Sequence, residues 1–233
     1  MNYGSLFAGI GGIDLGLDRA GMHCEWQVEI NSFCRRVLAK HWPDVLKYGD
    51  VKNVGQRNLK SVDLICGGFP CPVVSQAAHG RNTGEWLWVE FARVIHEMQP
   101  TWVLVENVCS GGAWRYWLPI VRRDLWRLGY ASLPLQLRAS QFGAPFRGAR
   151  IYVVAKANGD IKSIGTLYEK ASELQESTRF SWTDWGDAPP TALGMADGIP
   201  NRIHRLRALG RAVVPQIAEW IGRCILKVEL QFI

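Results

Sequence analysis

The sequence lacks the features that mark membrane, secreted and zinc-binding proteins. No stretch reaches the roughly 18 consecutive apolar residues that a membrane-spanning helix requires. No basic segment precedes the apolar residues near the N-terminus, so we expect no signal peptide and a cytoplasmic protein. The six cysteines form no CxxC pair and have no histidine at zinc-ligand spacing. This predicts reduced thiols, mostly small and buried, and no metal site.

The composition indicates a folded α/β protein with a basic surface. At 233 residues with 48% hydrophobic side chains, the chain suits one α/β domain with a small appendage. A formal charge of +6 suits a polyanionic partner, although many basic proteins bind nothing acidic.

Short apolar runs alternate with segments of helical periodicity over residues 1–155. This alternation predicts βα units and a mostly parallel sheet. The apolar spacing also predicts helices over 87–98 and 114–128, the second ended by Gly129. Besides a first strand before Phe7, the expected strands are 25–29, 62–66, 102–106, 133–137 and 151–155.

Residues 156–200 are polar, rich in Gly, Ser, Thr and Pro, and only weakly periodic. They are predicted to form a long loop or a very small subdomain. Residues 201–233 are expected to complete the α/β domain with a final amphipathic helix. Its buried face is predicted to consist of Ile217, Trp220, Ile221, Cys224, Ile225 and Val228.

The turn after the first strand, FAGIGG over residues 7–12, indicates a bound ligand. Its glycines let the backbone approach a ligand, and the following helix adds its positive N-terminal dipole. Because the GxGxxG spacing is incomplete, a dinucleotide is not strongly indicated. Glu29 and Asp50 follow at successive strand ends, where they could accept from ribose hydroxyls and an adenine amino group. A tight turn with two solvated acids is the alternative, but the order favours a nucleoside cofactor.

Cys71 and Glu106 are the candidate reactive residues. Cys71 ends the turn GGFPC after a buried strand, and Glu106 ends the next strand candidate. If these strands are neighbours, thiol and carboxyl meet at the edge where open α/β sheets bind ligands. Covalent chemistry with proton transfer is then plausible, with Arg147 and Arg150 activating the thiol or holding a phosphate. The alternatives are a buried cysteine, a helix N-terminal acid and two surface arginines.

Together these segments resemble the ordered motifs of the cytosine-5 DNA methyltransferase family, in the compact form of phage and prophage enzymes. The matching segments are FAGIGG, the acid of QVEIN, YGDV, GGFPCPVVS, VLVENV, QFGAPFRGARIYVVA and ALGRAVVPQIAEWIG. They cover nearly the whole chain except roughly 156–196. The resemblance implies a Rossmann-like S-adenosylmethionine-dependent methyltransferase fold. It places the catalytic and cofactor-binding domain at 1–155 and a very small recognition insertion at 156–200.

The resemblance also implies S-adenosylmethionine as cofactor and duplex DNA as partner, and we expect a monomer. Phe7 would stack near the adenine, and Gly9 and Gly11 would admit the methionine moiety. Glu29 would bind the ribose and Asp50 the adenine amino group. The other expected cofactor contacts are Ala8, Gly12, Ile30, Val51, Pro70, Leu87, Ala212 and Val213.

On the substrate side, the resemblance implies that Cys71 attacks C6 of a flipped-out cytosine while Glu106 engages N3. Arg150 would stand at the active site, and Ser75 would lie on the loop that closes over DNA. Trp182 and Trp185 would either reach the groove or hold the insertion against the body. The expected nucleic-acid contacts are Arg81, Arg147 and Arg179.

Three positions depart from the family pattern. Pro72 stands where glutamine is usual, Gly148 where arginine is usual, and Arg211 where asparagine is usual. They leave open a catalytically impaired DNA-binding relative, and an RNA (tRNA) methyltransferase is a third hypothesis beside the active DNA enzyme. A nicotinamide-dependent oxidoreductase fits poorly, because it would leave Cys71 without a task.

Overall fold

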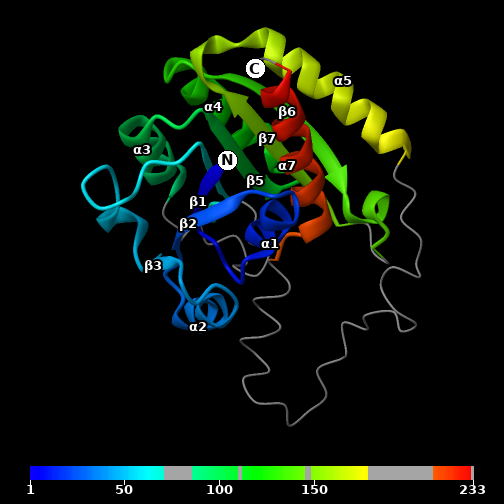
Figure 1. Ribbon diagram of the computed structural model, residues 1–233. Coiled ribbons are helices and arrows are strands. Elements are labelled where there is room, and N and C mark those ends of the chain that lie inside the picture. The colour runs from blue at the N-terminus through cyan, green and yellow to red at the C-terminus, as the bar shows by residue number, and fades with distance from the viewer. Residues whose placement is uncertain (71–85, 110–111, 145–147, 178–211, 232–233) are drawn as a thin grey trace.

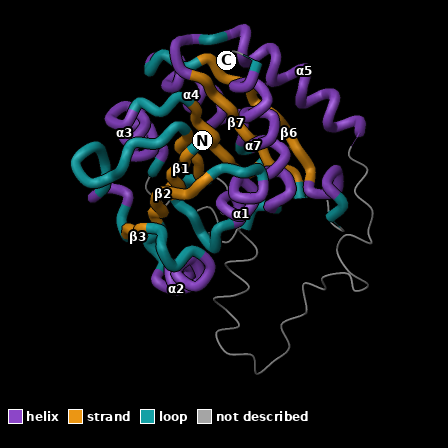
Figure 2. Tube along the Cα trace, viewed as in Figure 1, coloured by secondary structure: helices purple, strands orange, loops and turns teal. Residues whose placement is uncertain are grey.

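The computed structural model describes residues 1–70, 86–109, 112–144, 148–177 and 212–231. They contain a seven-stranded sheet of order β3-β2-β1-β4-β5-β7-β6 (Figures 1 and 2). β7 runs antiparallel to β5 and β6, and the other neighbours are parallel. The mostly parallel sheet is therefore confirmed. Its strands are β1 (Asn2–Leu6), β2 (His23–Val28), β3 (Leu46–Tyr48), β4 (Leu64–Gly67), β5 (Trp102–Val108), β6 (Ala131–Arg138) and β7 (Ala149–Lys156).

Helices cover both faces of the sheet. The helices are α1 (Gly12–Arg19), α2 (Ser32–His41), α3 (Trp88–Met98), α4 (Trp114–Arg127), α5 (Ile161–Ser177) and α7 (Pro215–Leu230). Apolar residues of α1, α5 and α7 pack on one face, and those of α3 and α4 pack on the other. Figure 1 shows α1 and α7 side by side in front of the sheet, and the two helices are in contact. None of the described helices is long and apolar enough to cross a lipid bilayer.

The predicted strands are all found, and each begins and ends within two residues of the prediction. β4 and β5 are buried along almost their whole length, as continuous apolar runs in parallel sheets are. The two strands are neighbours, with Gly67 opposite Val105. The condition stated for Cys71 and Glu106, that their two strands are neighbours, is therefore met.

The predicted final helix is α7, and all six residues predicted on its apolar face are buried. It begins with Pro215, whose fixed φ suits the first helical position. α1 packs closely against it at Gly16, where a Cβ would lie 2.6 Å from that of Ala218. The chain after residue 211 thus returns to the face of the sheet that α1 covers.

The structure removes one of the two alternatives for part of the expected insertion, the long loop. Residues 161–177, expected within a long loop or small subdomain, form α5. Ile164 and Leu167 are buried on one side of the helix, which contacts α7 and β6. Because few apolar side chains anchor the described part of this helix, its sequence shows only weak periodicity. The rest of the expected insertion, 178–200, lies outside the described residues, so the domain division stays a prediction.

Candidate active site at the carboxyl edge of the sheet

The glycine-rich turn after β1 has an unusual backbone. Phe7, Gly9 and Gly11 have positive φ angles of 54°, 59° and 86°. Positive φ is strained for phenylalanine, and such strain clusters at binding sites. A Cβ at Gly9 would meet no atom within 4 Å, so the turn is open there. At Gly11, by contrast, a Cβ would lie 2.5 Å from the ring of Trp42.

Glu29 joins this turn to the start of α2. One carboxylate oxygen accepts from the Gly9 N–H at 2.8 Å, and the other accepts from the Asn31 N–H, also at 2.8 Å. Each carboxylate oxygen can accept about two hydrogen bonds, so both retain capacity for a ligand hydroxyl. Ile30 beside it is 70% exposed. The acid predicted to bind ribose therefore lies directly against the open glycine turn.

Asp50 lies at the next strand end, beyond β3. It precedes the 3₁₀ turn η1 (Val51–Asn53), and its carboxylate accepts from a backbone N–H of that turn at 3.0 Å. The Glu29 N–H donates to the carbonyl of the last β3 residue at 3.0 Å. The two predicted cofactor acids therefore sit on connected segments of one edge.

Of the other predicted cofactor residues, Val213 lies against the same turn. A Cβ at Gly12 would lie 2.5 Å from the Val213 carbonyl oxygen, so the segment before α7 touches the start of α1. Leu87 precedes the first turn of α3 and is half-buried, as Ala212 is. Pro70 is exposed at the end of the segment that follows β4.

Glu106 and Arg150 form an ion pair across the antiparallel strands β5 and β7. The Arg150 Nε lies 2.9 Å from the Glu106 Oε1. Glu106 is only 8% exposed, and burial raises its pKa to about 7 although the Arg150 guanidinium lowers it. Near neutral pH this carboxyl can therefore either hold or release a proton, as a general acid must.

The segment that leads to Cys71 is held closely against Glu106. A Cβ at Gly68 would lie 2.5 Å from the Glu106 Oε2, so a larger residue would collide with the carboxylate. The buried Asn107 side chain donates from Nδ2 to the Phe69 carbonyl at 2.9 Å. The Phe69 ring packs among three tryptophans, Trp86, Trp88 and Trp117, at centroid distances of 5.3–6.0 Å. The end of this segment is thus fixed in space.

Several predicted site residues lie outside the described residues. They are Cys71, Ser75, Arg81, Arg147 and Arg179, together with Pro72, Trp182, Trp185 and Arg211. Of the three departures from the family pattern, Gly148 alone is described, and it has a φ of 35°. The structure therefore brings together the cofactor residues and the Glu106–Arg150 pair, and the roles of all these residues stay predictions.

Four of the five described cysteines are too buried to be nucleophiles. Cys24, Cys34, Cys66 and Cys224 are buried, and Cys109 is half-buried. Burial raises the pKa of the Cys66 thiol well above its usual range and that of Cys224 to about 12. Such thiols stay protonated and unreactive. Within the described part of the chain, no three His, Cys, Asp or Glu residues are grouped to hold a metal ion.

A buried polar cluster beneath the glycine turn was missed from the sequence. Asp14 of α1 is fully buried and accepts from Ser5 Oγ at 3.1 Å and Gln27 Nε2 at 2.8 Å. Burial raises its pKa to about 6. Polar residues within strands that are otherwise apolar were the available signal. This cluster ties β1, β2 and α1 together directly below the turn.

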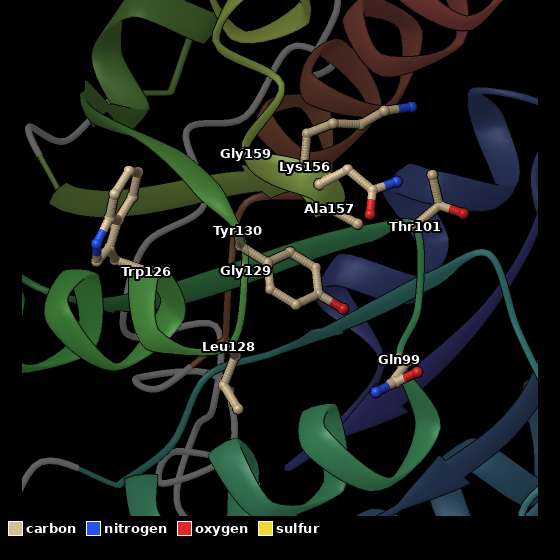
Figure 3. Close-up of a pocket in the computed structure, with 10 residues that line it drawn as sticks. Gln99, Thr101, Trp126, Leu128, Gly129, Tyr130, Lys156, Ala157 and Gly159 are labelled. Atoms are coloured by element: carbon tan, nitrogen blue, oxygen red, sulfur yellow. The ribbon is translucent and has the colours of Figure 1, made fainter.

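A pocket of about 570 Å³ lies at the opposite, amino edge of the sheet (Figure 3). Thr101 before β5, Tyr130 before β6 and Lys156 at the end of β7 contribute to it. None of the predicted site residues lines it. The Tyr130 hydroxyl already donates to the Pro100 carbonyl at 2.6 Å. This cavity therefore does not coincide with the predicted chemistry.

The strand order and the two helical layers are those of a Rossmann-like, S-adenosylmethionine-dependent methyltransferase fold. A crystal structure from Escherichia coli, described as a prophage-encoded DNA modification methyltransferase, superposes with a TM-score of 0.57 at 28% identity. The match covers 71% of this chain and 48% of that one. The structure of Spodoptera frugiperda DNMT2 gives the same TM-score at 19% identity over 68% of this chain and 50% of that one, which supports the fold alone.

The model of the C-5 cytosine-specific DNA methylase family matches residues 1–189. The Type II methyltransferase M2.BsuMI of Bacillus subtilis (strain 168) is 33% identical over 85% of this chain and 58% of its own length. M.HhaI of Haemophilus parahaemolyticus is 26% identical over 75% of this chain and 54% of its own. The chain belongs to the C-5 cytosine-specific DNA methylase family, and it spans about half the length of these relatives.

Proposed function

We propose that this chain is a DNA (cytosine-5)-methyltransferase that transfers a methyl group from S-adenosylmethionine to C5 of cytosine in duplex DNA. One observation carries the proposal. Buried Glu106, which is paired with Arg150, lies against Gly68, and Asn107 hydrogen-bonds to Phe69 in the segment that precedes Cys71. Membership of the cytosine-specific family supports this cofactor and this class of substrate.

The residues at the glycine turn fit S-adenosylmethionine. The open side of Gly9 admits the amino-acid moiety, and the free acceptor capacity of Glu29 suits two ribose hydroxyls. Asp50 can accept from the adenine amino group, while Phe7 and Phe91, whose ring centroids are 6.1 Å apart, supply an apolar wall. When bound, the cofactor supplies an electrophilic methyl group.

The protein's part of the chemistry falls to Cys71 and Glu106. The Cys71 thiolate forms a bond to C6 of cytosine. The C5–C6 π electron pair shifts toward C4 and N3, which makes C5 nucleophilic. The protonated Glu106 carboxyl donates to N3 and stabilises the developing charge, for which a pKa of about 7 is suitable. The C5 electron pair then takes the methyl group, whose bond to the donor sulfur would break and leave S-adenosylhomocysteine. A base removes the C5 proton, and the released electron pair expels the Cys71 thiolate.

The burial of Glu106 supports a flipped-out base. The side chain is only 10% exposed and is flanked by Gly68 and Arg150. A cytosine stacked in a duplex cannot bring N3 to such a group. Extrusion of the base costs about a few kcal/mol, which contacts with the protein must offset.

Transfer of labelled methyl groups from S-adenosylmethionine to unmethylated duplex DNA of mixed sequence tests the proposal. Wild type is expected to label cytosine C5, and Cys71→Ala is expected to abolish labelling. Cys224→Ala, which removes a buried thiol of α7 instead, is the matched control and is expected to retain activity. Folded wild type that binds the cofactor but labels no DNA would contradict the proposal. Labelling of tRNA in preference to DNA would reassign the substrate.

A further inference from the structure

Arg93 on α3 makes an unusual set of contacts with the turn that follows Asp50. Its Nη2 donates to two backbone carbonyls of that turn, Val51 at 2.9 Å and Val54 at 3.0 Å. One guanidinium nitrogen thereby bridges the first residue of the turn and the residue that follows it. The other guanidinium nitrogens stay available for further partners in fixed directions, which the single ammonium group of lysine cannot reproduce.

The guanidinium is itself fixed by two acids of the same helix. Its Nε donates to Glu90 at 2.8 Å and its Nη1 to Glu97 at 2.7 Å. Glu97 also accepts from the Gln56 N–H at 3.1 Å, so it contacts the chain beyond the turn as well. The side chain of Arg93 is about one third exposed, so each ion pair alone contributes little. Together these contacts fix the orientation of the guanidinium.

We infer that Arg93 is a positioning residue for recognition of the adenine ring. It does not touch the cofactor; it holds the Val51–Val54 turn, and that turn places the Asp50 carboxylate. The inference rests on the proposed function, because it takes Asp50 as the acceptor of the adenine amino group. When Arg93 is removed, the turn no longer fixes the direction of the Asp50 carboxylate. Selectivity for the adenine amino group is then lost before overall affinity for the cofactor.

The test compares binding of S-adenosylhomocysteine with binding of its 6-oxo analogue, S-inosylhomocysteine, by calorimetry. The 6-oxo analogue presents an acceptor to Asp50 where adenine presents a donor. Wild type is expected to prefer the adenine form by roughly ten- to hundredfold, as for a hydrogen bond to a charged group. In Arg93→Met we expect this preference to fall roughly tenfold. Arg93→Lys is expected to restore it only in part.

Two further variants separate positioning from folding. Arg123→Met on α4 removes an exposed arginine that pairs with its neighbour Asp124, and the preference is expected to stay unchanged. Gly55→Ala places a methyl group against the flexible end of Glu97, so it displaces that side chain without removing Arg93. It is expected to lower the preference even if Arg93→Met fails to fold.

The outcomes are distinguishable. Failure of folded wild type to bind either compound overturns the proposed function, and this inference with it. Binding by wild type with an unchanged preference in Arg93→Met or Gly55→Ala overturns this inference alone. A lower melting temperature with equal loss of affinity for both compounds also overturns it, because that is the signature of a merely structural role.

Discussion

The two edges of the central sheet each hold a paired acid, but the pairs are built differently. At the carboxyl edge, burial dominates at Glu106 and raises its pKa despite Arg150. At the amino edge, burial also raises the pKa of Glu229, but hydrogen bonds from Lys156 and Trp102 outweigh it and lower the pKa overall. The Lys156 ammonium in turn lies 4.6 Å from the centroid of the Trp102 ring.

The comparison shows which features mark a reactive site. The amino edge has the pocket of Figure 3, yet its charged groups are satisfied by partners within the protein. Positive φ angles occur at both edges, at Phe7 on the carboxyl side and at Gln99 and Asn158 beside the pocket, so backbone strain does not separate them. The carboxyl edge differs in having an acid that burial inclines toward the neutral form. Incomplete charge compensation, rather than cavity volume, therefore supports the proposed site.

The largest expected effect separates the two acids. Glu106→Gln removes the proton donor and is expected to lower methyl transfer by roughly 10²- to 10⁴-fold without loss of stability at pH 8. Glu229→Gln is expected to keep near-normal activity but to lose about 1–2 kcal/mol of stability. Methyl-transfer assays and urea unfolding of both variants make the comparison. Equal loss of activity in both would erase the distinction between the edges.

The pH dependence of stability sharpens the same contrast. The pKa values of Glu106 and Asp14 are raised from 4.5 to about 7 and from 3.8 to about 6. The folded state therefore binds protons more tightly than the unfolded state, and the stability gained is present below pH 4 and lost as pH rises to 7. Glu106→Gln should remove about 3 kcal/mol of this decline. Urea unfolding of wild type and Glu106→Gln at pH 5 and pH 8 measures this difference in stability. An identical pH dependence in the two proteins would contradict the prediction.

The titration of Glu106 should also appear in the pH dependence of the activity. We expect kcat/KM to fall as pH rises through about 7, where Glu106 loses its proton. Because the Arg150 guanidinium lowers this pKa, Arg150→Met should move the alkaline limb to higher pH while lowering the rate. A pH–rate profile of both proteins measures the shift. If the alkaline limb of the Arg150→Met profile stays at the wild-type pH, a group other than Glu106 is responsible for it.

The smallest expected effect comes from two matched glycines. Gly9 at the carboxyl edge and Gly159 at the amino edge have φ angles of 59° and 58°, and a Cβ at either meets nothing within 4 Å. Replacement by alanine should therefore cost about 1 kcal/mol at each site. Only Gly9→Ala is expected to weaken cofactor binding, by roughly tenfold, because the ligand occupies the open side. Equal cofactor affinities in the two variants would argue against a cofactor at the turn.

Much of this architecture follows from local sequence pattern. Continuous apolar runs located the buried strands, and helical spacing located α7 with its whole apolar face. The positions of Glu29 and Asp50 at successive strand ends could be predicted, because parallel strands end at one edge of the sheet. The resemblance to the methyltransferase family supplied the roles that position alone does not give.

The remainder depends on tertiary contacts that periodicity does not reveal. The antiparallel placement of β7, which brings Arg150 to Glu106, is set by packing across distant segments. α5 was missed because few of the residues described in its first half are buried. Arg93 resembles any solvated arginine on a helix surface until the turn beneath it is seen.

The most direct test of the account is covalent trapping on duplex DNA that contains 5-fluorocytosine, in the presence of S-adenosylmethionine. Fluorine at C5 cannot leave as a proton does, so the bond between Cys71 and C6 should persist after methyl transfer. The account predicts a denaturation-resistant protein–DNA complex that forms with wild type and Cys224→Ala but not with Cys71→Ala. Methyl transfer to ordinary DNA without any trapped complex, or trapping that survives Cys71→Ala, would contradict it.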